Sequence, residues 1–66
     1  MKNSIKVQRA ILDLTQEDLA NKIGVSRQTI NSIEKNRYVP STVLALKLSE
    51  VFNITVNEIF TLDKDD

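Results

Sequence analysis

Apolar residues recur at the spacing of α-helices along most of the chain, in short runs separated by serine, threonine, asparagine and glycine. The first run covers positions 4–12 and places Ile5, Arg9 and Leu12 on one helix face. The alternation of period two that would indicate strands is weak, and the chain has one Gly and one Pro. This pattern predicts an all-α fold made of five short helices.

Capping residues set the expected limits of the second and third helices. Thr15, with Asp18 three residues later, predicts a capping box, and Gly24 is expected to end that helix because the residue after a helix often needs a positive φ. Ser26 is the expected N-cap of a third helix that runs to Glu34. We expect these two helices to bury Leu19, Ala20, Ile23, Ile30 and Ile33 and to expose Arg27, Gln28, Asn31 and Ser32.

The last two expected helices start at Ser41 and at a second capping box, Thr55 to Glu58, which precedes Ile59 and Phe60. The fourth helix is apolar nearly all round, which is more than one core face requires. It therefore needs a second buried face, either against the fifth helix of the same chain or in a homodimer. The homodimer interface that we expect from the surplus apolar residues comprises Val51, Val56, Phe60 and Leu62.

The length and composition exclude several classes of protein. A chain of 66 residues is one small domain. It has no Cys and no His, which removes disulfides, thiol nucleophiles, the commonest metal ligands and the commonest general base. We therefore expect no enzyme, no metal and no cofactor. No apolar run exceeds the four residues 43–46, so we expect neither a membrane span nor a signal peptide, and a cytoplasmic protein.

Charge is balanced overall but unevenly distributed. Nine basic residues match nine acidic ones. Residues 1–12 carry three basic and no acidic side chains, and residues 25–47 carry four basic and one acidic. Residues 48–66 carry five acidic and one basic. A basic face opposite an acidic end fits a nucleic-acid binder, although charge alone is equally consistent with ordinary solvated faces.

Residues 16–35 have the spacing of a helix-turn-helix. Ala20 is small enough to let two helices approach, Gly24 suits the turn, and Val25, Ile30 and Ile33 would fix the second helix against the first. With these residues the sequence resembles the Xre family of helix-turn-helix regulators, which includes the Cro and repressor proteins of lambdoid phages. The similarity extends through Phe60, and its most specific segments are 14–20, 23–30, 33–37 and 40–41.

The resemblance implies a compact five-helix, lambda-repressor-like DNA-binding domain over residues 1–62, followed by an acidic tail, 63–66, that we expect to be frayed. Gln8 departs from the family pattern, because an apolar residue commonly packs at this position of the first helix. Val7 and Ile11 instead put apolar surface on the other side of that helix. The rotation of the first helix is therefore left open.

The resemblance also implies where DNA is contacted. The third helix would enter the major groove and the second would cross the backbone. Base contacts are expected from Arg27, Gln28, Thr29 and Ser32, and phosphate contacts from Gln16, Lys35, Asn36, Arg37 and Arg9. Arg9 is expected mainly to form a partly buried ion pair with Glu34, which otherwise faces the negative end of its own helix dipole.

The expected function is that of a sequence-specific double-stranded DNA-binding regulator, most simply a repressor, acting as a homodimer on a palindromic operator. No small-molecule ligand is expected. An antitoxin or controller protein would use the same DNA-binding chemistry, and a protein-interaction module would use the scaffold without DNA. RNA binding is less favoured because one Tyr and two Phe leave little for base stacking.

Overall fold

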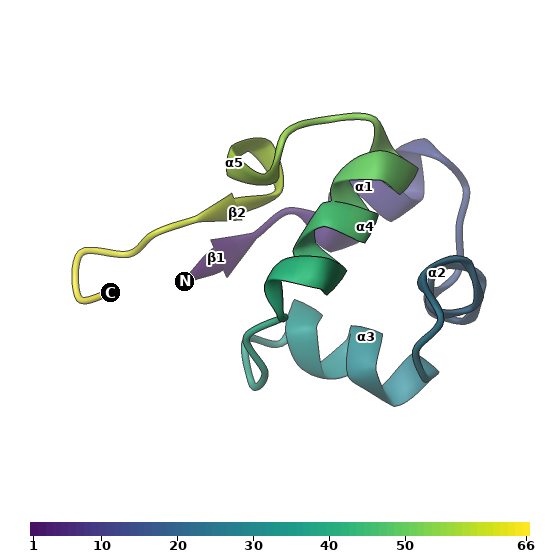
Figure 1. The fold of residues 1–66 in the computed structure, drawn as a ribbon, viewed down its shortest axis with the longest axis horizontal. Coiled ribbons are helices and arrows are strands. Elements are labelled where there is room, and N and C mark those ends of the chain that lie inside the picture. Colours follow the sequence, from purple (N-terminus) through teal and green to yellow (C-terminus); the bar gives the residue numbers. More distant parts are fainter.

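The computed structural model describes all 66 residues and contains five helices and one short strand pair (Figure 1). The five-helix prediction is confirmed. The longest helix has 11 residues, and none is long and apolar enough to cross a membrane. The elements are β1 (Lys2–Asn3), α1 (Ile5–Ile11), α2 (Gln16–Ile23), α3 (Arg27–Glu34), α4 (Thr42–Phe52), α5 (Val56–Ile59) and β2 (Phe60–Thr61).

The predicted caps account for the helix limits. Thr15 and Asp18 form the capping box of α2, with the Thr15 hydroxyl accepting from Asp18 N and the Asp18 carboxylate accepting from Thr15 N, both at 3.0 Å. The backbone hydrogen bond from Thr15 holds the pKa of Asp18 below its usual value. Gly24 ends α2 with φ of 75°, and Ser41 caps α4 by accepting from Leu44 N at 3.2 Å. The local sequence thus determines most of the helix ends.

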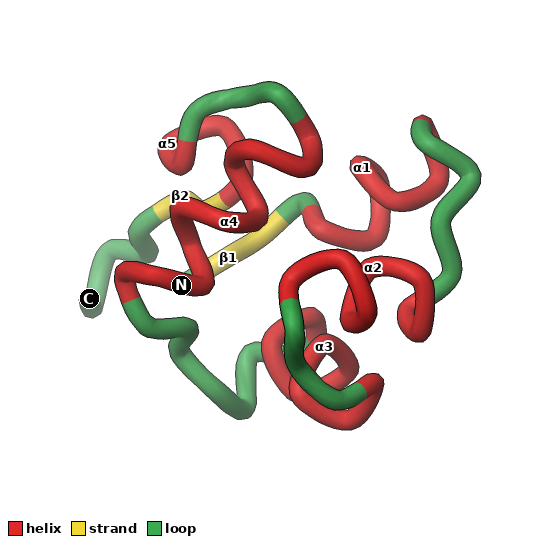
Figure 2. Tube along the Cα trace, turned by 45° about the vertical axis from the view of Figure 1, so that its right-hand side comes forward, coloured by secondary structure: helices red, strands yellow, loops and turns green.

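The core is shared by all five helices. Helix α2 packs against α3 and α4, and α5 packs against α4. Figure 2 shows α2 and α3 together at one end of the molecule, with α4, α5 and the strand pair at the other. The nine buried residues are Ile5, Leu19, Ala20, Ile23, Ile30, Ile33, Leu48, Phe52 and Ile59.

Helix α1 presents Ile5 and Arg9 to the core and Val7 and Ile11 to solvent. Gln8 is half-buried, which fixes the rotation that the sequence left open. Leu12, expected on the same helix face as Ile5 and Arg9, does not share their burial and is 45% exposed. Leu12 lies just beyond the end of α1, where the chain turns through Asp13 at φ of 56°, so helical spacing no longer determines its direction.

The two chain ends run together, which the sequence did not predict. Strands β1 and β2 are antiparallel, with Lys2 opposite Thr61 and Asn3 opposite Phe60. Phe60, expected in the fifth helix, therefore lies in β2.

The acidic tail is also held rather than frayed. The Met1 ammonium lies 2.7 Å from Asp63 Oδ2 and 3.0 Å from Asp66 Oδ2. The hydrogen bonds that the Met1 ammonium donates to these two carboxylates raise the pKa of the Met1 amine. The pKa of Asp66 is lowered, first because its carboxylate accepts a hydrogen bond from the backbone N–H of Asp63 and then because it accepts one from the Met1 ammonium.

Candidate nucleic-acid interface

Helix α3 is fixed on its inner side and open on its outer side. Ile30 and Ile33 are buried, and the Ser26 hydroxyl caps the helix by accepting from Thr29 N at 3.2 Å. The turn from α2 is closed by a hydrogen bond from Val25 N to the Ala20 carbonyl at 3.0 Å. The predicted helix-turn-helix at residues 16–35 is therefore formed, and α3 presents a rigid outer face.

The outer face of α3 carries the polar side chains expected to meet bases. Arg27 and Gln28 are exposed, whereas Thr29 and Ser32 are half-buried. The Thr29 hydroxyl also shares a 3.0 Å hydrogen bond with Ser26. A shallow polar recess runs along this face and is lined by Ser26, Gln28, Thr29, Ser32, Arg37 and Tyr38.

Arg9 and Glu34 form the predicted ion pair, which joins α1 to the end of α3. Arg9 Nε lies 2.7 Å from Glu34 Oε2, and Arg9 Nη2 lies 3.1 Å from Glu34 Oε1. The third guanidinium nitrogen, Nη1, donates to the Leu14 carbonyl at 3.0 Å. The Arg9 and Glu34 side chains are 14% and 9% exposed. Three of the five N–H groups of Arg9 are thus committed within the chain, in keeping with the mainly structural role expected of it, and its phosphate contact stays a prediction.

Gln16 extends this network from α2. Its Nε2 donates to Asn31 Oδ1 at 3.3 Å and to Glu34 Oε1 at 3.2 Å. Asn31, expected to be exposed, is half-buried for this reason. Both side-chain N–H groups of Gln16 thus have acceptors within the chain and join α2 to α3, and the phosphate contact expected of Gln16 stays a prediction.

The segment after α3 brings together the remaining residues expected to contact phosphate. Lys35, Asn36 and Arg37 are all exposed. Asn36 has φ of 60°, a conformation that asparagine tolerates better than most residues. The Arg37 N–H donates to the Ser32 carbonyl at 2.9 Å, which ties the segment to α3. Two exposed cations thus lie next to the outer face of α3.

Asn3 of β1 is a positioning residue that sequence reasoning missed. Its Nδ2 donates to the Ile33 carbonyl at 3.1 Å and to Asn36 Oδ1 at 3.0 Å. These bonds tie β1 to the end of α3 and to the segment that follows it. No local pattern connects position 3 with position 33, so only the tertiary structure reveals this contact.

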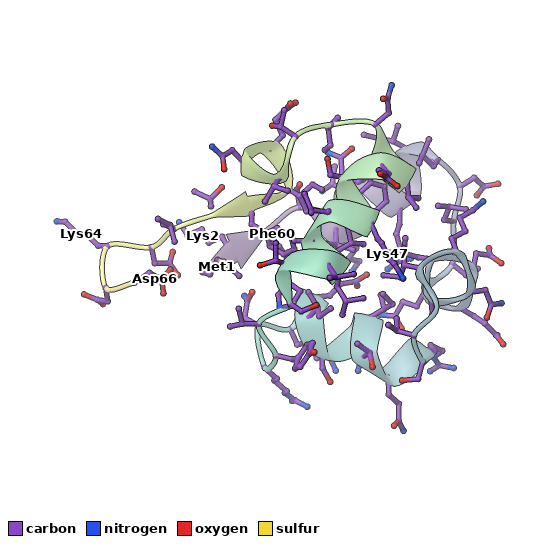
Figure 3. The ribbon with its side chains drawn as sticks, in the orientation of Figure 1. Met1, Lys2, Lys47, Phe60, Lys64 and Asp66 are labelled. Atoms are coloured by element: carbon purple, nitrogen blue, oxygen red, sulfur yellow. The ribbon has the colours of Figure 1, made fainter.

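The residues expected in a homodimer interface differ in how much of each side chain is left exposed. Val51 and Phe60 are half-buried and pack against the core of their own chain, so only part of each side chain is left for a partner, and Val51 stays a predicted interface residue. Val56 and Phe60 line an apolar groove whose other residues are Met1, Val39, Pro40, Thr42, Ala45 and Leu46. Leu62 is 76% exposed. In Figure 3, Met1 and Phe60 lie on the side of α4 opposite Lys47.

Packing against α5 accounts for only part of the apolar surface of α4. Phe52 is buried, but Val43 is 60% exposed and Leu46 is 55% exposed. Val39, in the segment before α4, is 73% exposed. We call the groove, which Val39 and Leu46 also line, together with Val43 and Leu62 the α4 face. From the sequence we expected a second buried face on α4, which contains Val43 and Leu46, but did not consider Val39.

The paired helices α2 and α3, with an unobstructed polar face on α3, define a helix-turn-helix DNA-binding domain. The family model for helix-turn-helix proteins matches residues 5–59. The chain belongs to this family, in its Xre-like form, and is accordingly a DNA-binding protein of transcription regulation.

Similar proteins are named as helix-turn-helix transcriptional regulators. An uncharacterized HTH-type transcriptional regulator of Methanocaldococcus jannaschii is 52% identical over the full length of both chains. The uncharacterized HTH-type transcriptional regulator YgzD of Bacillus subtilis is 42% identical, again over the full length of both. The solution structure of the SOS-response transcriptional repressor LexA from Eubacterium rectale matches with a TM-score of 0.79 and 29% identity, covering 94% of this chain and 66% of that one.

Proposed function

We propose that this protein is a sequence-specific regulator that binds a palindromic operator in double-stranded DNA as a homodimer and represses transcription by occupying it. The observation that carries the proposal is the outer face of α3, whose polar side chains project from a helix locked by Ile30, Ile33 and the Arg9–Glu34 pair. A rigid helix with free polar residues in its first turns is what major-groove reading requires.

Base reading is assigned to Arg27, Gln28, Thr29 and Ser32. Arginine can donate two hydrogen bonds to guanine O6 and N7, and glutamine can both donate to and accept from adenine. Arg27 and Gln28 are fully available for this because both are exposed at the start of α3. Thr29 and Ser32 are shorter and half-buried, so their contacts would require close approach of the duplex.

Arg27→Ala and Gln28→Ala should each weaken binding to the operator by about 1–3 kcal/mol while hardly changing binding to random-sequence duplex. The loss is selective because only the cognate base edge offers the matching donors and acceptors. Fluorescence anisotropy titrations on both duplexes measure it. Asn57→Ala, an exposed amide on α5, is the matched control and should bind both duplexes like wild type. Equal losses on the two duplexes would remove the base-reading role.

Phosphate contacts are assigned to Lys35, Asn36 and Arg37. Lys35→Gln or Arg37→Gln should weaken binding to all sequences and lower the slope of log K against log salt by about 0.9 per contact, because each neutralised phosphate releases counterions. A homodimer would lose two contacts per substitution. Lys64→Gln, in the acidic tail, is the control and should leave the slope unchanged. An unchanged slope for Lys35→Gln and Arg37→Gln would place the cations away from the backbone.

The homodimer is assigned to the α4 face. Val39 and Leu46 are exposed and line a groove formed mostly by apolar side chains. Val43 is exposed on the same helix as Leu46, and Leu62 is exposed directly after β2, whose Phe60 also lines the groove. Exposed apolar surface of this extent marks an interaction site. A second copy related by a two-fold axis would cover it and present two α3 helices to one side of the duplex. The operator would then be palindromic, with half-sites about 34–36 Å apart.

Repression by occupancy is the simplest mechanism for a domain of this size. The similarity to the ImmF control region 10 kDa protein of Bacillus phage phi105, which is 34% identical over 53 residues covering 80% of this chain and 59% of that one, supports a regulatory role. A reporter whose promoter overlaps the operator should be silenced by wild type and released by Gln28→Ala. A reporter activated by the protein would contradict repression.

A further inference from the structure

Tyr38 is the one aromatic residue beside the outer face of α3. It is 44% exposed and lines the shallow polar recess together with Gln28, Ser32 and Arg37. No hydrogen bond within the chain engages its hydroxyl, so the phenol is free to donate to a ligand. On its other side Tyr38 borders Met1 and Asp66 at the chain ends.

The backbone around Tyr38 is held in place before any ligand arrives. Asn36 N donates to the Ile33 carbonyl at 3.0 Å, and the Arg37 N–H donates to the Ser32 carbonyl at 2.9 Å. The Asn36 side chain is in turn held by Asn3 at 3.0 Å. These bonds hold the backbone as far as Arg37, directly before Tyr38, so less of this segment would have to be ordered when DNA binds.

The position of the recess favours a phosphate as the group that Tyr38 meets. In this docking mode the first residues of the recognition helix contact base edges. The segment after α3 follows the opposite end of the helix, so it would lie farther from those bases and nearer the rim of the groove, where the backbone runs. The recess joins Gln28 of the base-reading set to Arg37 of the phosphate-contacting set. Phosphate oxygens accept hydrogen bonds, and tyrosine hydroxyls are among the neutral groups that donate to them.

We propose that Tyr38 is a DNA-contacting residue whose hydroxyl donates a hydrogen bond to a backbone phosphate at the edge of the groove that α3 enters. This inference rests on the proposed DNA-binding function. It adds a neutral contact beside the cations Lys35 and Arg37. A neutral donor strengthens binding without releasing a counterion, so its signature differs from that of a cation.

The test is Tyr38→Phe, which removes the hydroxyl and keeps the ring. The full chain is titrated by fluorescence anisotropy against the operator and against random-sequence duplex at several salt concentrations. We expect binding to weaken about ten- to hundredfold on both duplexes, as for one lost hydrogen bond in each subunit of the homodimer. The slope of log K against log salt should stay at the wild-type value, whereas Arg37→Gln lowers it. Thr61→Val removes an exposed hydroxyl on β2 and should bind like wild type.

Three results would overturn the inference. Wild-type affinity of Tyr38→Phe would mean that the hydroxyl meets no phosphate, and a loss confined to the operator would assign it to a base. A loss accompanied by a lower thermal midpoint or by dissociation of the dimer would assign it to structure. In each case wild type still binds DNA, so the proposed function survives. If wild type bound no duplex at all, both the function and this inference would fail.

Discussion

Glu34→Ala should destabilise the folded chain by about 3–5 kcal/mol, because it leaves the largely buried Arg9 guanidinium without its carboxylate. Gln16 would lose an acceptor as well. A small domain is stable by only about 5–15 kcal/mol, so much of the folding free energy would be lost. Urea unfolding followed by circular dichroism measures the change. Glu50→Ala removes an exposed carboxylate from α4 and should change stability by less than about 0.5 kcal/mol.

A double variant separates the loss of the pair from the exposure of an unpaired charge. Arg9→Met combined with Glu34→Leu removes both charges and keeps apolar volume, so it should recover most of the stability that Glu34→Ala loses. If Glu34→Ala unfolded in urea like Glu50→Ala, the ion pair would not be holding α3. If the double variant were no more stable than Glu34→Ala, the bonds to Leu14 and Gln16 would matter more than charge pairing.

Leu46→Lys and Leu62→Lys should each convert the protein from a dimer to a monomer and weaken operator binding by about 10²–10⁴-fold. A second linked site gains its affinity from effective concentration, and a monomer forfeits that gain. Both side chains are exposed on the single chain, at 55% and 76%, so neither substitution disturbs the core. Sedimentation equilibrium should give twice the chain mass of 7.5 kDa for wild type and the chain mass for both variants.

Val7→Lys is the matched control for these variants. Val7 is 59% exposed on α1, so the same charge is added at a similarly exposed apolar position outside the α4 face. It should remain dimeric and bind the operator. Dimers that persist in Leu46→Lys and Leu62→Lys but dissociate in Val7→Lys would move the interface to the exposed α1 surface around Val7 and Ile11.

The parts of the fold that depend on local chemistry could be predicted from the sequence. Thr15, Gly24 and Ser26 set helix ends through hydrogen bonds and backbone preferences that span only a few residues. The Arg9–Glu34 pair joins distant positions, yet it could be anticipated because a carboxylate at the end of a helix needs a compensating charge. The resemblance to a family placed that charge at Arg9.

The features that could not be predicted arise from contacts between distant parts of the chain. Strands of two residues leave no alternation to detect, so the pairing of Asn3 with Phe60 has no local signal. The commitment of Gln16 to Asn31 and the packing of Val51 depend on how helices meet. The sequence identified these side chains as polar or apolar surface, and the tertiary structure decides which of them remain available for a partner.

Selection of duplexes from a random pool tests the central claim, that α3 reads base sequence, most directly. Wild-type protein is mixed with random duplex at physiological salt, and the bound DNA is sequenced over successive rounds. The account predicts enrichment of one palindromic sequence with half-sites about one helical turn apart, and loss of that enrichment for Gln28→Ala. Bound DNA with no preferred sequence, or no salt-dependent binding to duplex at all, would contradict it, and the second result would identify a protein-interaction module instead.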